Sequence, residues 1–188
     1  MSVKPNQEKL FTSNCEHYLT PPHIVDKVVE VLGETGEISL DPCANEAMNI
    51  PSIRQYNKED NGLAILNSWG GLNDSWKCTV YCNPPYGRQI RKWTQKATEQ
   101  FLAHTNMSII LLVPARVDTL WFQELIVATS PLNRVCFWKG RLRFSTPNYT
   151  GKVSGAPFPS AIILLSHNTE HFKKFEQVFG NYGLMTGF

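Results

Sequence analysis

In residues 108–113, five successive apolar side chains follow Ser108 without the polar alternation of a half-exposed strand. A strand of this kind is buried on both faces, which is typical of a mostly parallel sheet covered by helices on each side. The surrounding segments fit that arrangement, because short apolar runs alternate with helical patterns along the chain. The sequence therefore predicts an α/β protein with a doubly wound sheet.

The positions of further elements follow from apolar spacing and from helix-breaking residues. A helix is predicted to start at Thr20-Pro21-Pro22, with Thr20 as its cap, and to stop at Gly33 or Gly36. The weak pattern between Asn45 and Lys77 predicts at most one short strand, near 53–56. The other expected helices cover 88–103, 118–128 and 171–179, and the other expected strands cover 38–40, 78–82, 134–138 and 161–165, the last two paired antiparallel.

The length of 188 residues, 42% of them hydrophobic, predicts a single domain over 1–188 with residues 1–14 as a poorly ordered tail. No apolar run approaches the roughly 18 residues that a membrane span needs, and the polar N-terminus lacks a signal peptide core. A cytoplasmic location without a membrane partner is therefore expected. The five cysteines include no CxxC pair and no histidines show ligand spacing, so neither disulfides nor a metal site are expected.

Positive charge is unevenly distributed along the chain, although the net charge is only +2. Segments 75–98 and 125–169 contain no Asp or Glu. On one face of the protein, their basic residues would form a surface that attracts phosphate; a solvated helix face with loop lysines is the alternative. These basic residues are Lys77, Arg88, Arg91, Lys92, Lys96, Arg134, Lys139, Arg141, Arg143 and Lys152.

The sequence Asn83-Pro84-Pro85-Tyr86 directly follows the apolar segment 78–82. Two successive prolines fix the backbone and remove two N–H donors, so this loop is stiff and presents hydrogen-bond acceptors. It suits an amine whose lone pair is delocalised into a ring, because bonds to the Asn83 side-chain oxygen and the Pro84 carbonyl favour the nucleophilic form. Holding that amine in line with a sulfonium methyl group needs neither a metal nor a covalent intermediate. Tyr86 is a candidate for stacking on the base.

Taken alone, this tetrapeptide also fits an ordinary turn after a strand. Two other motifs precede it in the chain: Thr20-Pro21-Pro22, and Asp41-Pro42-Cys43-Ala44-Asn45 directly after the first expected strand. In doubly wound sheets, ligands bind at the carboxyl ends of the strands. The loops after 40, 82 and 113 are therefore the expected site.

Together with 112–116, 139–142 and 156–161, these motifs resemble the phage-type DNA N6-adenine methyltransferases, a Dam-like family, over about residues 18–165. The resemblance implies a class I methyltransferase fold, Rossmann-like and seven-stranded, mostly parallel with an antiparallel last strand. It also implies an adenine-specific DNA methyltransferase that uses S-adenosyl-L-methionine as cofactor and DNA as partner. Catalysis would then rest on Asn83, Pro84, Pro85 and Tyr86.

The resemblance also implies which residues bind the cofactor. Thr20 would contact its methionine end, and the loop after the first strand would wrap its amino acid and ribose, with Asp41 accepting from the ammonium group. In this loop, Pro42, Cys43, Ala44 and Asn45 replace the usual glycine-rich sequence. In the wider class, an acidic residue after the second strand binds the ribose hydroxyls, and Glu59 and Asp60 are the nearest candidates for this role here. A contact between Asp60 and the adenine amine is an equal alternative.

Other residues are candidates for DNA contacts. Phe144 occupies the position where related enzymes carry an aromatic residue that stacks on the extruded base, although a core phenylalanine is the alternative. Arg116 would contact phosphate or pair with Asp118. Sequence preference is expected in the loop 145–159. The basic residues expected at the DNA are Arg88, Lys139, Arg141 and Arg143.

The catalytic loop also leaves rival functions open. In any conjugated NH2 group, the nitrogen lone pair is delocalised and must be made more nucleophilic. RNA amines, protein glutamine and cytosine N4 are therefore alternative substrates. A degenerate module of the same fold that binds DNA without catalysis is a further alternative. The basic stretches and the length of the resemblance favour DNA adenine.

Overall fold

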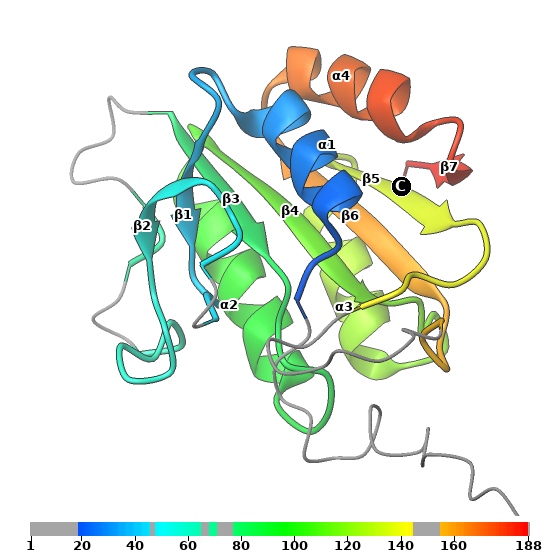
Figure 1. Cartoon of the computed structure of the whole chain (residues 1–188), viewed down its shortest axis with the longest axis horizontal. Helices are drawn as coiled ribbons and strands as arrows, with labels where there is room; N and C mark the ends of the chain where they lie inside the picture. The colour runs from blue at the N-terminus through cyan, green and yellow to red at the C-terminus, as the bar shows by residue number, and fades with distance from the viewer. Residues whose placement is uncertain (1–18, 46–47, 65–67, 71–76, 145–154, 188) are drawn as a thin grey trace, which may run out of the picture.

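The computed structural model of the chain describes residues 19–45, 48–64, 68–70, 77–144 and 155–187, which form a seven-stranded sheet and helices (Figure 1). The tail expected over 1–14 lies outside the described residues. The strands are β1 (Ile38–Asp41), β2 (Ser52–Gln55), β3 (Cys78–Cys82), β4 (Met107–Pro114), β5 (Asn133–Trp138), β6 (Ser160–Ser166) and β7 (Gly183–Thr186). The helices are α1 (Pro22–Leu32), α2 (Ile90–Ala103), α3 (Leu120–Thr129) and α4 (Thr169–Phe179).

The sheet is mixed, with strand order β2-β1-β3-β4-β6-β5-β7. β1 pairs in parallel with β2 and β3, and β3 pairs in parallel with β4. β6 is antiparallel to both β4 and β5, and β7 is antiparallel to β5. Five strands therefore run one way, and β6 and β7 run the other way. The expected antiparallel pairing of the strands near 134–138 and 161–165 is confirmed.

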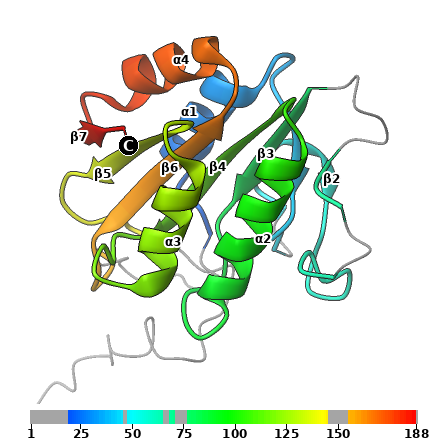
Figure 2. The same ribbon diagram turned by 180° about the vertical axis from the view of Figure 1, so that it is seen from behind.

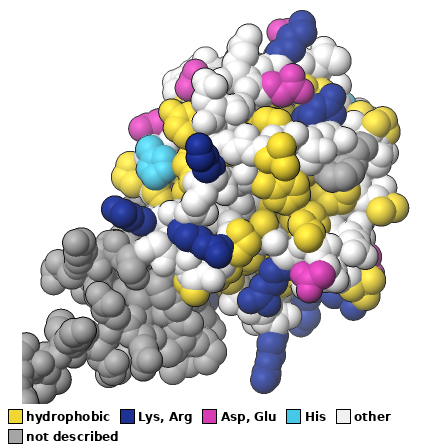
Figure 3. Space-filling view, turned by 90° about the vertical axis from the view of Figure 1, so that its right-hand side faces the viewer, with side chains coloured by type: hydrophobic (Ala, Val, Ile, Leu, Met, Phe, Trp, Pro, Cys, Tyr) yellow, Lys and Arg dark blue, Asp and Glu magenta, His cyan; other side chains and the backbone are white. Residues whose placement is uncertain are grey.

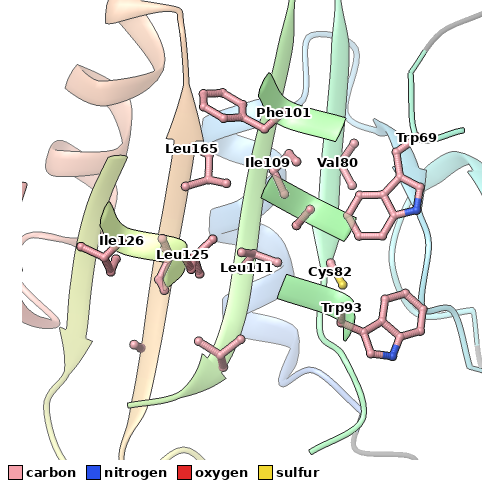
Figure 4. Packing of buried hydrophobic residues seen from close by; sticks show 14 of the residues in the cluster. Trp69, Val80, Cys82, Trp93, Phe101, Ile109, Leu111, Leu125, Ile126 and Leu165 are labelled. Carbon is pink, nitrogen blue, oxygen red and sulfur yellow. The ribbon is translucent and has the colours of Figure 1, made fainter. Parts of the chain in front are cut away.

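Helices cover both faces of the sheet, as predicted for a doubly wound fold. α1 and α4 lie together on the face seen in Figure 1, and α2 and α3 lie together on the face seen in Figure 2. On β4, Ile109, Leu111 and Val113 pack toward α2 and α3, whereas Ile110 and Leu112 pack toward α1 and α4. Figure 4 shows the first of these clusters. All residues of β4 are buried, which explains its unbroken apolar sequence.

Two expectations about local structure were wrong. The cap of α1 is Pro21, and no side chain caps the helix. Thr20 is instead drawn inward, where its hydroxyl lies 2.9 Å from that of Tyr81. The second difference is β7, which was not predicted because its four residues show no alternation and begin with a glycine. Gly183 lies against the carbonyl oxygen of Phe137, so a side chain there would prevent the pairing of β7 with β5.

None of the helices in the described ranges is both long and apolar enough to cross a membrane.

Candidate active site

Three loops that follow neighbouring strands meet at one edge of the sheet: 42–45 after β1, 83–87 after β3 and 115–119 after β4. They border a cleft of about 1330 Å³, which the segment after β2 and the first turn of α2 also line. A pocket for one small ligand usually measures roughly 300–1,000 Å³, so this cleft has room for two ligand groups. Seven of the predicted site residues line this cleft: Pro42, Cys43, Ala44, Pro85, Tyr86, Arg88 and Arg116.

The side-chain amide of Asn83 is held from both of its ends. Its Nδ2 donates to the hydroxyl of Thr20 at 3.2 Å, and its Oδ1 accepts from the hydroxyl of Tyr86 at 2.8 Å. The Thr20 hydroxyl also bonds to Tyr81, and the Tyr86 hydroxyl also lies 3.3 Å from the carbonyl oxygen of Leu112. These contacts join the segment before α1 to β3 and β4, and the amide lies with its nitrogen toward Thr20 and its oxygen toward Tyr86. Thr20 and Asn83, predicted from separate motifs, are thus in direct contact.

Tyr86 also belongs to a cluster of three aromatic rings. Its ring lies edge-on to Phe158, with centroids 5.2 Å apart, and edge-on to Phe144, with centroids 6.0 Å apart. Phe158 is half-buried and lines the cleft together with Tyr86. Phe144 is 0% exposed and does not line the cleft. In this structure Phe144 lies in the core cluster, which is the alternative considered for it from the sequence.

Asp41 lies at the end of β1, behind the residues that line the cleft. Its carboxylate accepts a hydrogen bond from the backbone N–H of Cys43 at 2.9 Å, which shapes the loop 42–45. The side chain is only 4% exposed. Burial raises the pKa of Asp41 to about 7, and the bond from Cys43 offsets only part of this rise. Asp41 is thus poised to ionise fully when a cation comes close.

The remaining residue of this loop, Asn45, is not among the residues that line the cleft. Its side-chain nitrogen donates to Asn49, 3.2 Å away, and Asn49 in turn donates to the carbonyl oxygen of Thr20 at 3.0 Å. Asn45 therefore ties the loop to the start of α1.

The segment after β2 is folded by short hydrogen bonds. The side chain of Asn57 accepts from the backbone N–H groups of Glu59 and Asp60, and the Asp60 carboxylate accepts from the N–H of Asn57. Asp60 is exposed and does not line the cleft, whereas Asn57 and Asn61 do. Gly62 packs on the carbonyl oxygen of Pro42, where any side chain would clash. This segment therefore presents amides, rather than an acid, to the cleft.

Trp93 of α2 carries a buried hydrogen-bond donor. Its side chain is 6% exposed, and its indole nitrogen has no hydrogen-bond partner among the residues that the structure describes. Figure 4 shows this nitrogen directed away from the labelled core side chains, and Trp93 is one of the residues that line the cleft. An unsatisfied buried N–H costs about 1–3 kcal/mol, so a ligand that supplies an acceptor here would gain from it.

Some basic residues line the cleft, and others are exposed outside it. Arg88, Arg91, Lys92 and Arg116 line the cleft, and Arg91 pairs with Glu124 at 2.9 Å. Arg116 forms no ion pair with Asp118, although both residues lie in the described part of the chain. Lys139, Arg141 and Arg143 are exposed outside the cleft. Figure 3 shows Lys and Arg gathered on the lower half of one face, at the level of the active-site edge in Figure 1, whereas most Asp and Glu lie higher.

Several functional candidates escaped the sequence analysis. The side chains of Asn57, Trp93 and Trp121 line the cleft but belong to none of the sequence motifs. For Phe158, the only indication in the sequence was its place in the segment 156–161, which contributes to the family resemblance. Within the described ranges, no group of three or more His, Cys, Asp or Glu residues could hold a metal ion.

Comparison with known protein families identifies a family for this chain. A family model described as DNA N-6-adenine-methyltransferase (Dam) matches residues 8–182. No curated protein sequence matches the chain. The family match covers the three loops of the active-site edge, the segment after β2 and the aromatic cluster. The chain therefore belongs to the DNA N-6-adenine-methyltransferase (Dam) family.

Proposed function

We propose that the cleft binds S-adenosyl-L-methionine beside an adenine of DNA, within a class I methyltransferase fold, and that the N6 amine takes the methyl group directly. The observation that carries this proposal is the fixed amide of Asn83, anchored through its nitrogen to Thr20 next to a cleft large enough for two ligands. Because the nitrogen of the amide is committed to Thr20, its oxygen is the end offered to the substrate.

The chemistry follows from that acceptor. The adenine amine replaces the Tyr86 hydroxyl and donates to the Asn83 oxygen and the Pro84 carbonyl, which localises the N6 lone pair. When bound, S-adenosylmethionine supplies a methyl group on a positively charged sulfur. The amine nitrogen, held by Asn83 and Pro84, would take that methyl group as the methyl–sulfur bond breaks and leaves its electron pair on sulfur, and the amine would then release a proton to solvent. Orientation of the amine accounts for most of the acceleration in this mechanism.

The residues around the other part of the cleft fit the cofactor. We assign its ammonium group to Asp41, whose buried carboxyl is only partly satisfied by Cys43. The loop of Pro42, Cys43 and Ala44 would lie along the methionine and ribose, and Thr20 would border the methionine end. The indole N–H of Trp93, which has no partner among the described residues, matches the hydrogen-bond acceptors of a nucleoside. Asn57 and Asn61 replace Asp60 as our candidates for the ribose hydroxyls.

A direct test supplies radiolabelled S-adenosylmethionine with unmethylated DNA, RNA and a protein extract. Label in DNA as N6-methyladenine is the expected result, and mapping its positions would also define the recognition sequence. Label in protein or RNA alone would overturn the DNA assignment and favour a glutamine or RNA amine as substrate. Cofactor binding without transfer to any of them would favour the non-catalytic module.

We also assign DNA contacts to Arg88, Arg116, Lys139, Arg141 and Arg143. Replacing Arg141 or Arg143 by Ala is expected to weaken DNA binding and to lower the dependence of log K on log [salt] by about 0.9 for each phosphate that the variant no longer neutralises, because fewer counterions are released. Titrations between low and moderate salt would measure this slope.

Lys77→Ala is the matched control for these arginines. Lys77 precedes β3 at the opposite edge of the sheet and pairs with Glu34 at 2.7 Å, so its loss should leave the salt slope unchanged. An unchanged slope in both arginine variants would place Arg141 and Arg143 away from the DNA.

A further inference from the structure

We propose that Tyr81 is a positioning residue for methyl transfer: it accepts the hydrogen of the Thr20 hydroxyl and thereby keeps the nitrogen of the Asn83 amide facing Thr20. The inference rests on the proposed function, because it gives Tyr81 a part in presenting the amide oxygen to the amine. Tyr81 itself lies behind the site. Its side chain is 1% exposed, belongs to the core cluster under α1 and α4, and does not line the cleft.

The Thr20 hydroxyl meets two partners. Its oxygen lies 2.9 Å from the Tyr81 hydroxyl and accepts from the Asn83 nitrogen at 3.2 Å. An amide nitrogen can only donate, so the single hydrogen of Thr20 is not used in the contact with Asn83. Thr20 is 3% exposed, and among the described residues only Tyr81 offers an acceptor to that hydrogen. Since a buried donor without an acceptor is costly, we assign the Thr20 hydrogen to the Tyr81 oxygen.

The direction of this hydrogen decides which end of the Asn83 amide faces Thr20. While Thr20 donates to Tyr81, it presents only lone pairs to Asn83, and these match the NH2 end of the amide. A Thr20 hydrogen that turned toward Asn83 would instead match the amide oxygen. The amide would then rotate and present its NH2 group to the incoming amine. Two donors would face each other, and the amine would not be held.

Thr20 and Tyr81 are both held in place for this role. The carbonyl oxygen of Thr20 accepts from the side chain of Asn49 at 3.0 Å, so the backbone that carries the hydroxyl is anchored independently of Tyr81. Tyr81 lies within β3, two residues before Asn83. Burial raises the pKa of Tyr81 well above its ordinary value, so the phenol keeps its proton. Tyr81 therefore acts through a hydrogen bond and not through a charge.

A double-mutant cycle on the full-length protein tests whether Tyr81 acts through Thr20. Tyr81→Phe keeps the buried ring and removes only the hydroxyl. At saturating cofactor and DNA, it is expected to lower the single-turnover rate of methyl transfer by about 3- to 10-fold, the effect of one neutral hydrogen bond, with cofactor affinity unchanged. In a Thr20→Val background, which has no hydroxyl to orient, Tyr81→Phe should cause no further loss. In a Thr20→Ser background, which keeps the hydroxyl, the loss should persist.

Tyr182→Phe is the matched control for the removal of a phenol hydroxyl. Tyr182 is 41% exposed and stacks on Trp138, so its variant should stay within about twofold of the wild-type rate. A wild-type rate in a folded Tyr81→Phe variant would overturn the inference. The same holds for a loss that is equally large with Thr20 and with Val at position 20, because Tyr81 would then act independently of the hydroxyl.

Side-chain NMR tests the same geometry without any methyl transfer. In protein with isotope-labelled asparagine, the NH2 signals of Asn83 are identified by their absence in Asn83→Ala. Tyr81→Phe is expected to shift these signals and to speed their exchange with solvent, whereas Tyr182→Phe should do neither. Unchanged Asn83 signals in Tyr81→Phe would overturn the inference and leave the proposed function intact. Shifted signals in a protein that methylates no DNA would support the role of Tyr81 in holding Asn83 and overturn the proposed function itself.

Discussion

Asn83→Ala is expected to abolish measurable methyl transfer, a loss of at least about 10³-fold, while affinity for S-adenosylmethionine stays within about tenfold of wild type. The reason is geometric. In the proposed mechanism, the Asn83 amide is the acceptor that orients the amine, and the amide itself is held by Thr20 and Tyr86. Single-turnover rates of methyl transfer and calorimetric titration with the cofactor would separate the two effects.

Two milder variants are controls for this prediction. Tyr86→Phe removes a hydroxyl that the substrate must displace anyway, so its effect on the rate should be small. Thr20→Val removes the partner of the Asn83 nitrogen and lets the amide rotate, so we expect a lower kcat with a smaller change in KM. Transfer at the wild-type rate by Asn83→Ala would remove Asn83 from the mechanism.

Asp41→Asn is expected to act in opposite directions on stability and on cofactor binding. The carboxyl ionises near pH 4 in the unfolded chain but only near pH 7 in the folded protein, because it is buried. Below about pH 4 the carboxyl is neutral in both states and does not lower the free energy of unfolding. As the pH rises toward 7, the unfolded chain is favoured by up to about 4 kcal/mol, since each pKa unit is worth about 1.4 kcal/mol.

The asparagine variant removes this cost. Its side-chain oxygen can still accept from Cys43, so the loop keeps its shape. Asp41→Asn should therefore be more stable than wild type at pH 8, and the difference should shrink toward pH 4. In contrast, it should bind S-adenosylmethionine about 10- to 100-fold more weakly, because a charged hydrogen bond to the ammonium group is lost.

Denaturant unfolding and cofactor titration at several pH values would measure both effects. Wild-type cofactor affinity should fall as the pH drops below about 7, and the variant should lose that dependence. Asp26→Asn, on an exposed position of α1, is the matched control and should change neither quantity. If Asp41→Asn binds the cofactor like wild type, Asp41 only shapes the loop and the ammonium group has another partner.

Apolar patterning predicted most of the fold, because burial on both faces leaves a clear trace in strands such as β4. It could not predict that β6 lies between β4 and β5, since pairing order depends on contacts between residues distant in sequence. β7 was missed for a related reason. Its four residues are held by pairing with β5 rather than by any pattern of their own.

The candidate site was predictable where backbone chemistry is distinctive, as at Asn83-Pro84-Pro85-Tyr86. The sequence could not predict which aromatic residue of the cluster is exposed to the cleft. Phe144 and Phe158 are similar residues in similar apolar surroundings, and only burial distinguishes them. Likewise, Asp60 and Asn57 are three positions apart, and the turn between them decides which of them lines the cleft.

In the structure, the hydroxyl of Tyr86 donates to the Asn83 oxygen, the acceptor to which the proposed mechanism assigns the adenine amine. Substrate entry is therefore an exchange of one hydrogen bond for another of similar strength, and the net affinity gained from that bond is small. Soluble adenine nucleotides, which lack the rest of a DNA strand, gain little from this site. Discrimination between a free nucleotide and a base within a polymer then falls to the charged surface beyond the cleft, so cellular ATP is expected to be a poor competitor.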